Sequence, residues 1–154
     1  MVFKLYPEAL PWWTFEDYQS MLDAMARFKP RTVLEFGPGS STLAMIEGGA
    51  GHIDTLEDNP EYYARTHERL ALRFPDRVTV HRYRHNDPVS VDACDSKRYD
   101  LGFVDGPRNT MERPASFAYA LARCAVVLCH DVATMERITP LQFDRVGTLG
   151  LVKR

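Results

Sequence analysis

Apolar and polar positions along this chain follow two periods, one typical of helices and one of buried strands. Helical spacing comes first: Thr14 is a candidate N-cap, Asp17 follows at the capping-box distance, and Pro30 stops the pattern. Between them, apolar residues recur three or four positions apart, at Phe15, Tyr18, Met21, Leu22, Met25 and Phe28. This spacing predicts an amphipathic helix within an N-terminal helical segment, residues 1–30.

The rest of the chain alternates short β-rich runs with helical stretches. Strands are predicted at residues 32–36, 52–57, 78–81, 99–104 and 125–129. Helices are predicted at 40–46, 60–74 and 113–122, and the tail offers two further strands, 143–146 and 148–152. Alternating strands and helices pair in parallel through right-handed crossovers. We therefore expect one α/β domain, residues 1–154, with a doubly wound, mostly parallel, Rossmann-like sheet and a C-terminal strand pair.

The composition of the chain limits the classes of function that it can have. With 45% apolar and 26% charged residues the chain is typical of a globular domain, and a net charge of −2 gives no support for nucleic-acid binding. No apolar run approaches the roughly 20 residues that a membrane helix needs, and the start of the chain does not resemble a signal peptide. Three cysteines, Cys94, Cys124 and Cys129, suggest free thiols, so we expect a cytoplasmic protein.

Four predicted strands end in residues that can carry chemistry. In doubly wound sheets, ligands bind outside the carboxyl ends of the strands. The ends in question are Glu35–Gly39, Glu57–Asn59, Asp105–Arg108 and His130–Asp131. We expect the functional site along this edge of the sheet.

The first of these ends is a glycine loop. Gly37 and Gly39 stand between a strand and a helix, where backbone can approach a ligand closely and the helix offers free N–H groups. A dinucleotide fingerprint would place Gly or Ala where this chain has Thr42. Glu35 would repel a pyrophosphate but attract a cationic amino-acid head group. These two features favour S-adenosylmethionine over NAD.

Glu57 supports the same interpretation. It ends the second strand, 22 residues after Glu35, where a carboxylate accepts hydrogen bonds from both hydroxyls of a ribose. The glycine pair alone could be only a tight strand-to-helix turn. Together, in this order, the two signals predict a nucleoside-containing cofactor.

At these positions the chain resembles class I S-adenosylmethionine-dependent methyltransferases. Val33–Thr42 resembles the first motif of that family and Leu56–Pro60 the second, within a likeness that runs from about Arg31 to Val132. The departure is Ser41, where many members carry a third glycine. Narrower likenesses to the polysaccharide-biosynthesis group that includes glucuronoxylan 4-O-methyltransferases lie at Glu57–Tyr63, Arg82–Arg84, Val104–Arg108 and Leu128–Val132. That group would imply O-methylation of a sugar hydroxyl, such as one on a uronic acid.

The family resemblance assigns roles to the cofactor-side residues. Glu35 would lie near the methionine amino group, and Gly37 and Gly39 would pass beneath the cofactor. N–H or hydroxyl groups of Ser41 and Thr42 would contact it. The remaining residues follow later strands: Glu57 would hold the ribose, Asp58 would stand beside the adenine, and the loop Arg84-His85-Asn86 would approach the adenine edge.

The acceptor side has two open interpretations. Asp105, His130 and Asp131 would converge if their strands are neighbours, and could then act as general base or hold a divalent metal ion, as in catechol-type O-methyltransferases. The structural alternatives are an Asp105 that caps its own turn, a semi-buried His130 and an Asp131 that caps the next helix.

Several other residues also have two interpretations. Arg108, and with less weight Arg113, could bind an acceptor carboxylate or lie on the surface. The run His81–His85 could be a solvated strand or contact a phosphate or uronate. Trp12 and Trp13 could fill the core, cover the cofactor or pack against another subunit. A homo-oligomer therefore stays open.

Methyl transfer from a sulfonium is a direct displacement and needs no covalent nucleophile, which agrees with the absence of a nucleophile–base arrangement. An Asn/Asp-Pro-Pro-aromatic run, common in amino-group methylation, is missing, and Asp105–Arg108 occupies its place. We therefore expect an O-methyltransferase acting on a small-molecule or saccharide hydroxyl. The alternatives are a cofactor-binding module of the same fold without turnover and an NAD-type dinucleotide-binding domain.

Overall fold

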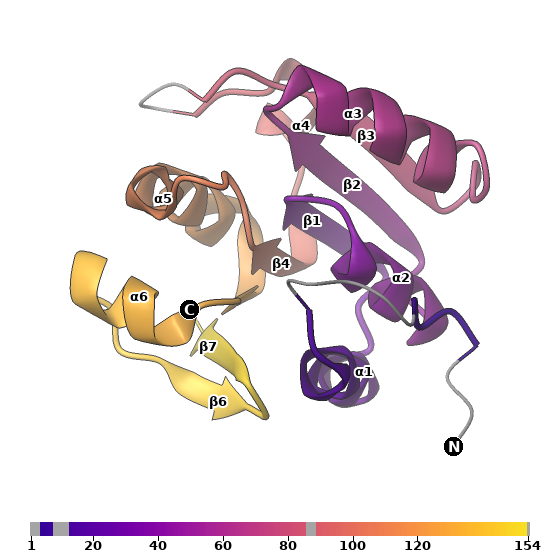
Figure 1. Ribbon diagram of the computed structural model, residues 1–154. Helices are drawn as coiled ribbons and strands as arrows, with labels where there is room; N and C mark the ends of the chain where they lie inside the picture. Colours follow the sequence, from indigo (N-terminus) through magenta and orange to yellow (C-terminus); the bar gives the residue numbers. More distant parts are fainter. Residues whose placement is uncertain (1–3, 8–12, 86–88, 154) are drawn as a thin grey trace.

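In the computed structural model, which describes residues 4–7, 13–85 and 89–153, a seven-stranded sheet runs through the molecule (Figure 1). The strands are β1 (Thr32–Phe36), β2 (His52–Glu57), β3 (Val78–Arg82), β4 (Tyr99–Val104), β5 (Cys124–Cys129), β6 (Asp144–Val146) and β7 (Leu149–Lys153). Their order is β3-β2-β1-β4-β5-β7-β6. Strands β1 to β5 pair in parallel, and β7 is antiparallel to both of its neighbours. The predicted doubly wound, mostly parallel sheet with a C-terminal strand pair is confirmed.

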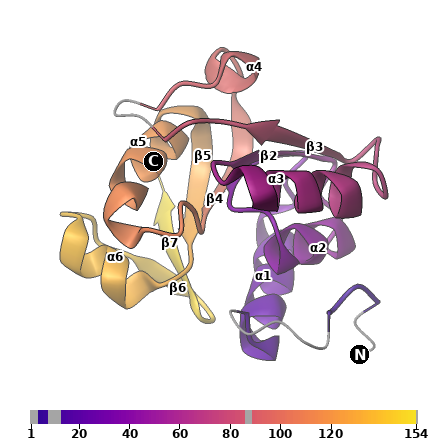
Figure 2. The same ribbon diagram turned by 45° about the horizontal axis from the view of Figure 1, so that its top comes forward.

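Helices cover both faces of this sheet (Figures 1 and 2). They are α1 (Phe15–Phe28), α2 (Ser40–Glu47), α3 (Pro60–Thr66), the π-helix η1 (His67–Ala71), α4 (Asp92–Asp95), the 3₁₀ helix η2 (Thr110–Glu112), α5 (Arg113–Arg123) and α6 (Val132–Ile138). Apolar side chains of α1, α2 and η1 form a core on one face, and those of α4, α5 and α6 form a second core on the other. Burial on both faces explains why the inner strands are continuous apolar runs.

Helix α1 begins as the sequence predicts. The Thr14 hydroxyl accepts a hydrogen bond from the backbone N–H of Asp17 at 3.2 Å, and the Asp17 carboxylate accepts one from the Thr14 N–H at 2.9 Å. The helix ends at Phe28, and Lys29 adopts a left-handed conformation with φ 47° before Pro30. The capping box and the stop are both confirmed.

One predicted helix is wrong in its second half. The stretch 60–74 is α-helical only to Thr66, continues as the wider π turn to Ala71, and ends there. The wider turn changes the phase of the helix, and Leu70 is the residue of α3 and η1 that is buried. The α-helical part of this segment, α3, buries no residue. The packing of Leu70 against the sheet therefore determines the geometry of α3 and η1.

Two strand-end turns touch through their backbones. A Cβ atom on Gly37, whose φ is +86°, would lie 3.0 Å from the carbonyl oxygen of Asp105, and one on Gly106 would lie 3.0 Å from the nitrogen of Gly37. Only glycine allows this approach at both positions. The contact holds the glycine loop after β1 directly against the turn after β4.

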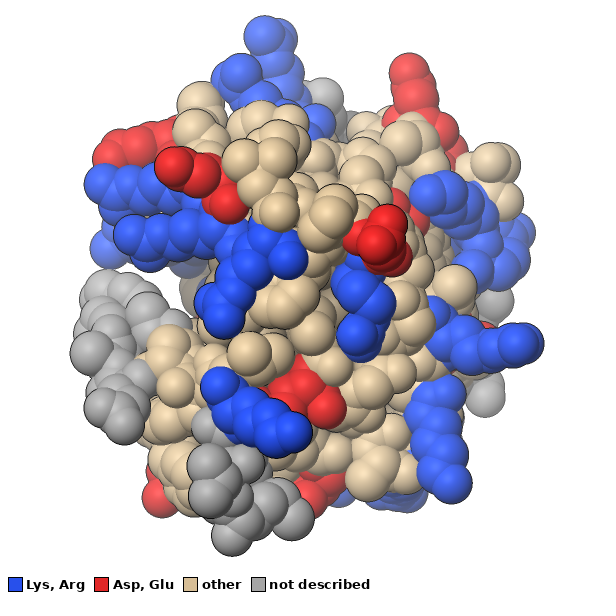
Figure 3. Space-filling view, turned by 90° about the vertical axis from the view of Figure 1, so that its right-hand side faces the viewer, with Lys and Arg blue, Asp and Glu red and all other residues tan. Residues whose placement is uncertain are grey.

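The remaining general expectations can be compared with the described residues. All three cysteines are free and buried, as expected. Among the helices that the described residues form, none is long and apolar enough to cross a membrane. On the face drawn in Figure 3, Lys and Arg side chains are spread out together with Asp and Glu.

Candidate cofactor and acceptor site

The glycine loop is fixed from inside the protein by Glu35. This carboxyl group is fully buried, and it accepts hydrogen bonds from the Ser41 hydroxyl at 2.5 Å and the Thr42 hydroxyl at 2.7 Å. Burial raises the pKa of Glu35 to about 7, against the opposing effect of the two hydroxyls. The hydroxyls that we expected to face the cofactor therefore face Glu35, and the groups left for a ligand are the N–H groups at the start of α2.

Gly39 presents open space to that ligand. A Cβ atom placed on Gly39 would meet nothing within 4 Å, in contrast to Gly37. The Gly39 N–H donates to the Thr42 hydroxyl at 2.9 Å, so the loop keeps its shape without a ligand. A cofactor can thus lie against the backbone here, in front of the positive end of α2.

Glu57 lies at the end of β2, next to β1 in the sheet. It is 9% exposed, and one oxygen accepts a hydrogen bond from the Asn59 N–H at 2.9 Å. Burial raises the pKa of Glu57 to about 7, and the nearby charge of Asp58 adds to the rise. A buried carboxyl group at this place can accept hydrogen bonds from a partner that supplies hydroxyl donors, as a ribose does.

His85 lies beyond the end of β3, on the same side of the chain as Tyr83. Its Nδ1 is buried and has no hydrogen-bond partner among the described atoms, and its ring stands 6.5 Å from that of Tyr83 in an edge contact. An unpartnered ring nitrogen fits the predicted contact with the adenine edge. Asn86, the next residue of that prediction, lies outside the described residues.

On the acceptor side, the structure brings together the three residues predicted to converge. Strands β4 and β5 are neighbours. Nδ1 of His130 lies 3.5 Å from Asp105 Oδ1 and 3.4 Å from Asp131 Oδ1, and its Nε2 lies 3.4 Å from Asp17 Oδ2. Although burial opposes it, these carboxylates raise the pKa of His130 to about 10. The imidazole is therefore protonated at neutral pH.

Arg113 completes the cluster, and its role was missed from the sequence. Its guanidinium lies 2.8 Å from Asp131 and 3.4 Å from Asp105 and also donates to the Pro107 carbonyl at 3.0 Å, and its side chain is only 6% exposed. Neither interpretation given from the sequence, an acceptor contact or a surface arginine, describes this buried ion pair. Arg113 directly follows η2, in the segment that returns the chain from Asp105 to α5, and this nearness in the chain was the available signal.

The structural alternatives for the acidic residues can also be compared with these contacts. Asp131 does occupy the N-cap position of α6, with φ 52°, but its side chain makes no capping bond and pairs with Arg113 and His130. The hydrogen bond described for the Asp105 side chain comes from the Trp13 indole at 3.1 Å. Both carboxylates therefore point into the cluster.

Trp13, two residues before α1, packs over this cluster. It is 6% exposed, stacks on the His130 ring at 5.6 Å between centroids and packs edge-on against Phe103 at 5.8 Å. The core-packing interpretation thus holds for Trp13, which also contacts the site. Trp12 lies outside the described residues.

The predicted metal ligands do not fit a divalent ion in this arrangement. Asp105, His130 and Asp131 are ligand types that can hold such an ion, and one atom of each lies within 4.8 Å of the others. However, the buried guanidinium of Arg113 already pairs with both carboxylates. A metal ion would have to displace this cation, whose guanidinium is also fixed by its bond to the Pro107 carbonyl.

The other basic candidates lie outside the cluster. Arg108 is exposed on the turn after β4, and Arg82 and Arg84 are exposed along β3 and its continuation. Tyr83 is buried against Phe36, and His81 pairs with Asp54 inside the sheet. The alternation predicted for this segment therefore matches its burial.

Neither the comparison with protein-family models nor that with curated proteins found a match. Solved structures do match. A protein from Klebsiella pneumoniae proposed to be an O-methyltransferase has a TM-score of 0.66 at 21% identity, over 90% of this chain and 65% of that one. An O-methyltransferase from Bacillus cereus in complex with S-adenosylhomocysteine (SAH) has 0.64 at 17%, over 95% and 81%.

A third match is an S-adenosylmethionine-bound amino pentose methyltransferase from Micromonospora echinaspora, with a TM-score of 0.53 at 19% identity over 73% of this chain and 50% of that one. The chain thus spans about two thirds of the first of these proteins and half of the third. The sheet order and these likenesses together show that the chain has the Rossmann-like fold of S-adenosylmethionine-dependent methyltransferases.

Proposed function

We propose that this chain binds S-adenosylmethionine and transfers its methyl group to a hydroxyl of a small molecule or saccharide. The observation that carries the proposal is the pairing, on adjacent strands, of an open glycine turn at Gly39 with a buried carboxyl group at Glu57. The methyltransferase fold and the SAH-bound Bacillus cereus neighbour support it.

The cofactor side follows from these two points. The backbone at Gly37 and Gly39 and the first N–H groups of α2 would receive the methionine part, and Glu57 would accept the ribose hydroxyls. Asp58 and His85 would flank the adenine. Glu35 acts through Ser41 and Thr42, which it fixes in place, and not by direct contact. The threonine hydroxyl that closes this loop takes the place of the third glycine of a dinucleotide fingerprint, which disfavours NAD.

On the acceptor side, the cluster can receive a proton. The cluster contains three carboxylates and two cations, and so carries one net negative charge. The carboxylates belong to Asp17, Asp105 and Asp131, and the cations are Arg113 and His130. When bound, the cofactor supplies an electrophilic methyl group that passes directly to the acceptor oxygen. We propose that Asp105 takes the hydroxyl proton, because it follows β4 and lies closest to the glycine loop. Arg113 and His130 hold its carboxylate in position, and His130 is too strongly protonated to be the base.

The finer proposal concerns the acceptor. Exposed Arg108, three residues beyond Asp105, would bind a carboxylate of the acceptor. This agrees with the likeness to the glucuronoxylan 4-O-methyltransferase group, and the neighbour described as an amino pentose methyltransferase supports a sugar acceptor in general. A uronic acid is therefore the first acceptor class to test. Since Arg113 holds both carboxylates, we propose that transfer does not depend on a divalent metal ion.

The decisive test is calorimetric titration with S-adenosylmethionine, SAH and NAD. The wild type should bind the first two and not NAD. Gly39→Ala meets no protein atom within 4 Å, so it should leave the melting temperature unchanged while weakening cofactor binding by at least about tenfold. Equal binding by wild type and Gly39→Ala, or preference for NAD, would contradict the proposed cofactor site.

Turnover is tested separately, with uronic acid and neutral sugar acceptors. Asp105→Asn should keep cofactor affinity and lower the transfer rate by about 100-fold or more, as expected for loss of a general base. Chelators should leave the rate unchanged. Cofactor binding with no transfer to any hydroxyl acceptor would favour the second candidate, a binding module of the same fold.

A further inference from the structure

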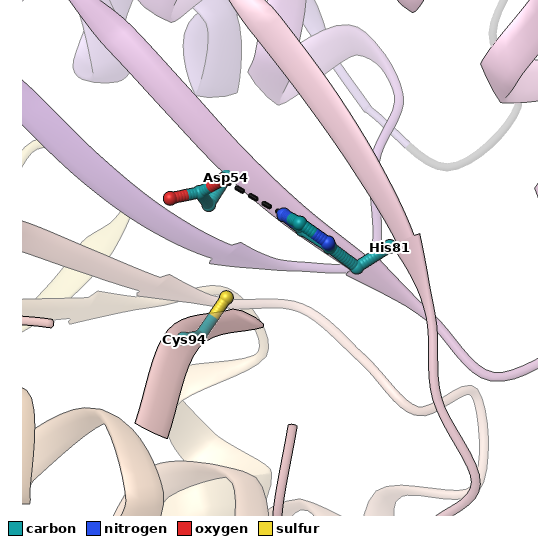
Figure 4. Close-up of side chains that lie close together, drawn as sticks. All are labelled: Asp54, His81 and Cys94. Carbon is teal, nitrogen blue, oxygen red and sulfur yellow. Dashed lines mark hydrogen bonds and ion pairs between the residues drawn. The ribbon is translucent and has the colours of Figure 1, made fainter. Parts of the chain in front are cut away.

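A second group of metal-ligand side chains lies inside the sheet, away from the strand ends. Asp54 on β2, His81 on β3 and Cys94 on α4 each offer one ligand atom, all within 4.8 Å of one another (Figure 4). Asp54 is 2% exposed and Cys94 is 0% exposed. Asp54 lies three residues before Glu57, about 10 Å along the strand, so this group is separate from the proposed cofactor site.

The three donor atoms form a set that suits zinc. A thiolate sulfur, an imidazole nitrogen and a carboxylate oxygen are the ligands that proteins use for this ion, and the thiolate disfavours magnesium and calcium. We infer that Asp54, His81 and Cys94 bind a zinc ion, with water at the fourth position.

The geometry requires only side-chain adjustment. Around a tetrahedral zinc ion, ligand atoms stand roughly 3.3–3.8 Å apart, given metal–ligand distances of about 2.0–2.3 Å. Nε2 of His81 and Oδ1 of Asp54 are now hydrogen-bonded at 2.7 Å and would move apart, and the Cys94 sulfur already lies within 4.8 Å of both ligand atoms. The Tyr99 hydroxyl donates to Oδ2 of Asp54 at 2.9 Å and can keep this bond, which would orient the carboxylate toward the ion.

The competing cation here can leave. Nζ of Lys97 lies 2.8 Å from Oδ2 of Asp54, and its side chain is 46% exposed. Arg113, which holds the Asp105 cluster, is 6% exposed and fixed by three contacts. A lysine on a flexible stem can turn to solvent at small cost, whereas the buried arginine cannot. Of the two groups with suitable ligands, the one around Cys94 is therefore the better zinc site.

Binding would exchange protons for the metal. His81 is protonated at neutral pH, because its bonds to Asp54 and Cys94 raise its pKa to about 9 against the effect of burial. Zinc binds a neutral imidazole and a thiolate, so its binding would displace the His81 proton and would weaken as the pH falls.

An approach from solvent exists. A shallow groove of about 590 Å³ runs along β3 and the segment that leads into α4, and its lining includes His81 and Ala93. The groove reaches the ligand His81 directly and also reaches Ala93, the residue before the ligand Cys94. The side chains of Asp54 and Cys94 themselves lie deeper. The ion can therefore reach the cluster without opening of the main core.

The experiment is titration of the full chain with Co²⁺, used as a spectroscopic probe of the zinc site, followed by displacement with Zn²⁺. The wild type should develop a thiolate-to-cobalt charge-transfer band in the near ultraviolet that Zn²⁺ abolishes. Cys94→Ser should lose the band, and His81→Gln should weaken zinc affinity by more than about 100-fold, since even residues that only support a ligand contribute 10- to 100-fold. Cys129→Ser, which removes another buried thiol, should keep both signals.

Two further variants keep the test decisive if Cys94→Ser or His81→Gln fails to fold, as judged by circular dichroism. Lys97→Ala removes the competing cation and should raise zinc affinity. His130→Gln alters the Asp105 cluster and should leave the cobalt band intact. No thiolate band in the wild type, a band that survives Cys94→Ser, or an unchanged affinity in Lys97→Ala would overturn the inference. None of these readouts depends on methyl transfer, so the two proposals fail separately.

Discussion

The acidic residues of this chain show how neighbours decide the chemistry of one side-chain type. Glu35 accepts hydrogen bonds from the hydroxyls of Ser41 and Thr42, and burial raises its pKa to about 7. Asp131 lies beside His130 and Arg113, and these partners lower its pKa to about 2. The carboxyl group of Glu35 therefore stabilises the glycine loop through its hydrogen bonds and is partly protonated near neutral pH. The carboxylate of Asp131, in contrast, stays negatively charged at the site.

His130→Gln should remove stability that depends on pH. Because the pKa of His130 is raised from 6.5 to about 10, its contribution is fully present below pH 6.5 and is lost as the pH rises through about 10. Urea unfolding should show the variant about 2 kcal/mol less stable at pH 6, and nearly equal to wild type at pH 10.5. The exposed His67→Gln is the control and should show no such trend. A loss that stays constant between pH 6 and 10.5 would contradict the ion-pair assignment.

At the scale of elements, the start of α1 joins parts of the chain that are far apart in sequence. The Thr148 N–H, in the turn between β6 and β7, donates to the Ser20 hydroxyl at 3.0 Å, and the Thr148 hydroxyl donates to Asp17 at 2.6 Å. Asp17 also caps α1 and faces His130. The C-terminal strand pair is thus fastened to the helix that supports the acceptor cluster.

Gly147→Ala should loosen this attachment. Gly147 has φ +56°, and a Cβ atom there would collide with the Ser20 hydroxyl and lie 2.9 Å from the Ser20 Cβ. The left-handed conformation costs about 1–2 kcal/mol and the collision adds about 1 kcal/mol or more to the loss of unfolding free energy. Gly49→Ala is the matched control, since Gly49 has φ +93° but no atom within 4 Å of a Cβ. Equal stability losses in the two variants would show that the contact with Ser20 does not matter.

The element scale also shows what sequence can and cannot predict. Strands β2 and β4 match their predicted bounds because short runs rich in β-branched and aromatic residues, followed by polar residues at the strand end, are local signals. The π turn at His67–Ala71 was not predicted, since docking of Leu70 on the sheet decides it. Helix α4 is only four residues long and has too few positions to show a period.

The same limit applies to the site. The glycine loop and Glu57 are predictable because strand ends alone place them. The contact of Trp13 with Asp105 is not predictable, because the two residues lie 92 positions apart, and the burial of Arg113 depends on its pairing with Asp131 after the next strand, β5. The pairing of Asp54 with His81 was equally hidden, although an acidic residue in the middle of an apolar strand was a sign that a partner exists.

At the scale of the whole molecule, the acceptor cluster depends on every layer of the fold. Asp17 comes from α1, Asp105 and Arg113 from either side of the turn after β4, and His130 from the end of β5. Parallel pairing of β4 with β5 brings the strand ends together, and the segment before α1 covers them with Trp13. The fold therefore brings these side chains together without a ligand, and two protein cations partly neutralise the three carboxylates.

If protein cations hold this cluster, removal of one should create a metal site. Arg113→Met keeps the apolar stem but leaves Asp105 and Asp131 without the guanidinium. Breaking a fully buried ion pair costs about 3–5 kcal/mol, and because Asp131 is 41% exposed the loss here should be smaller but should still lower the melting temperature. Magnesium should then bind the freed carboxylates and recover about 2.7 kcal/mol at a concentration 100 times its Kd. The wild type should show no magnesium-dependent change in melting temperature.

A second arginine variant distinguishes the effect of the charge of the cluster from a general loss of stability. Arg137→Met removes an exposed arginine whose described contact is a 3.5 Å bond to Thr134, and it should neither lower the melting temperature nor respond to magnesium. Magnesium also avoids thiolate ligands, so the Asp54–His81–Cys94 group should not contribute to the response. If wild type and Arg113→Met are stabilised equally by magnesium, Arg113 does not exclude the ion, and metal-assisted deprotonation of the acceptor becomes the better mechanism for this site.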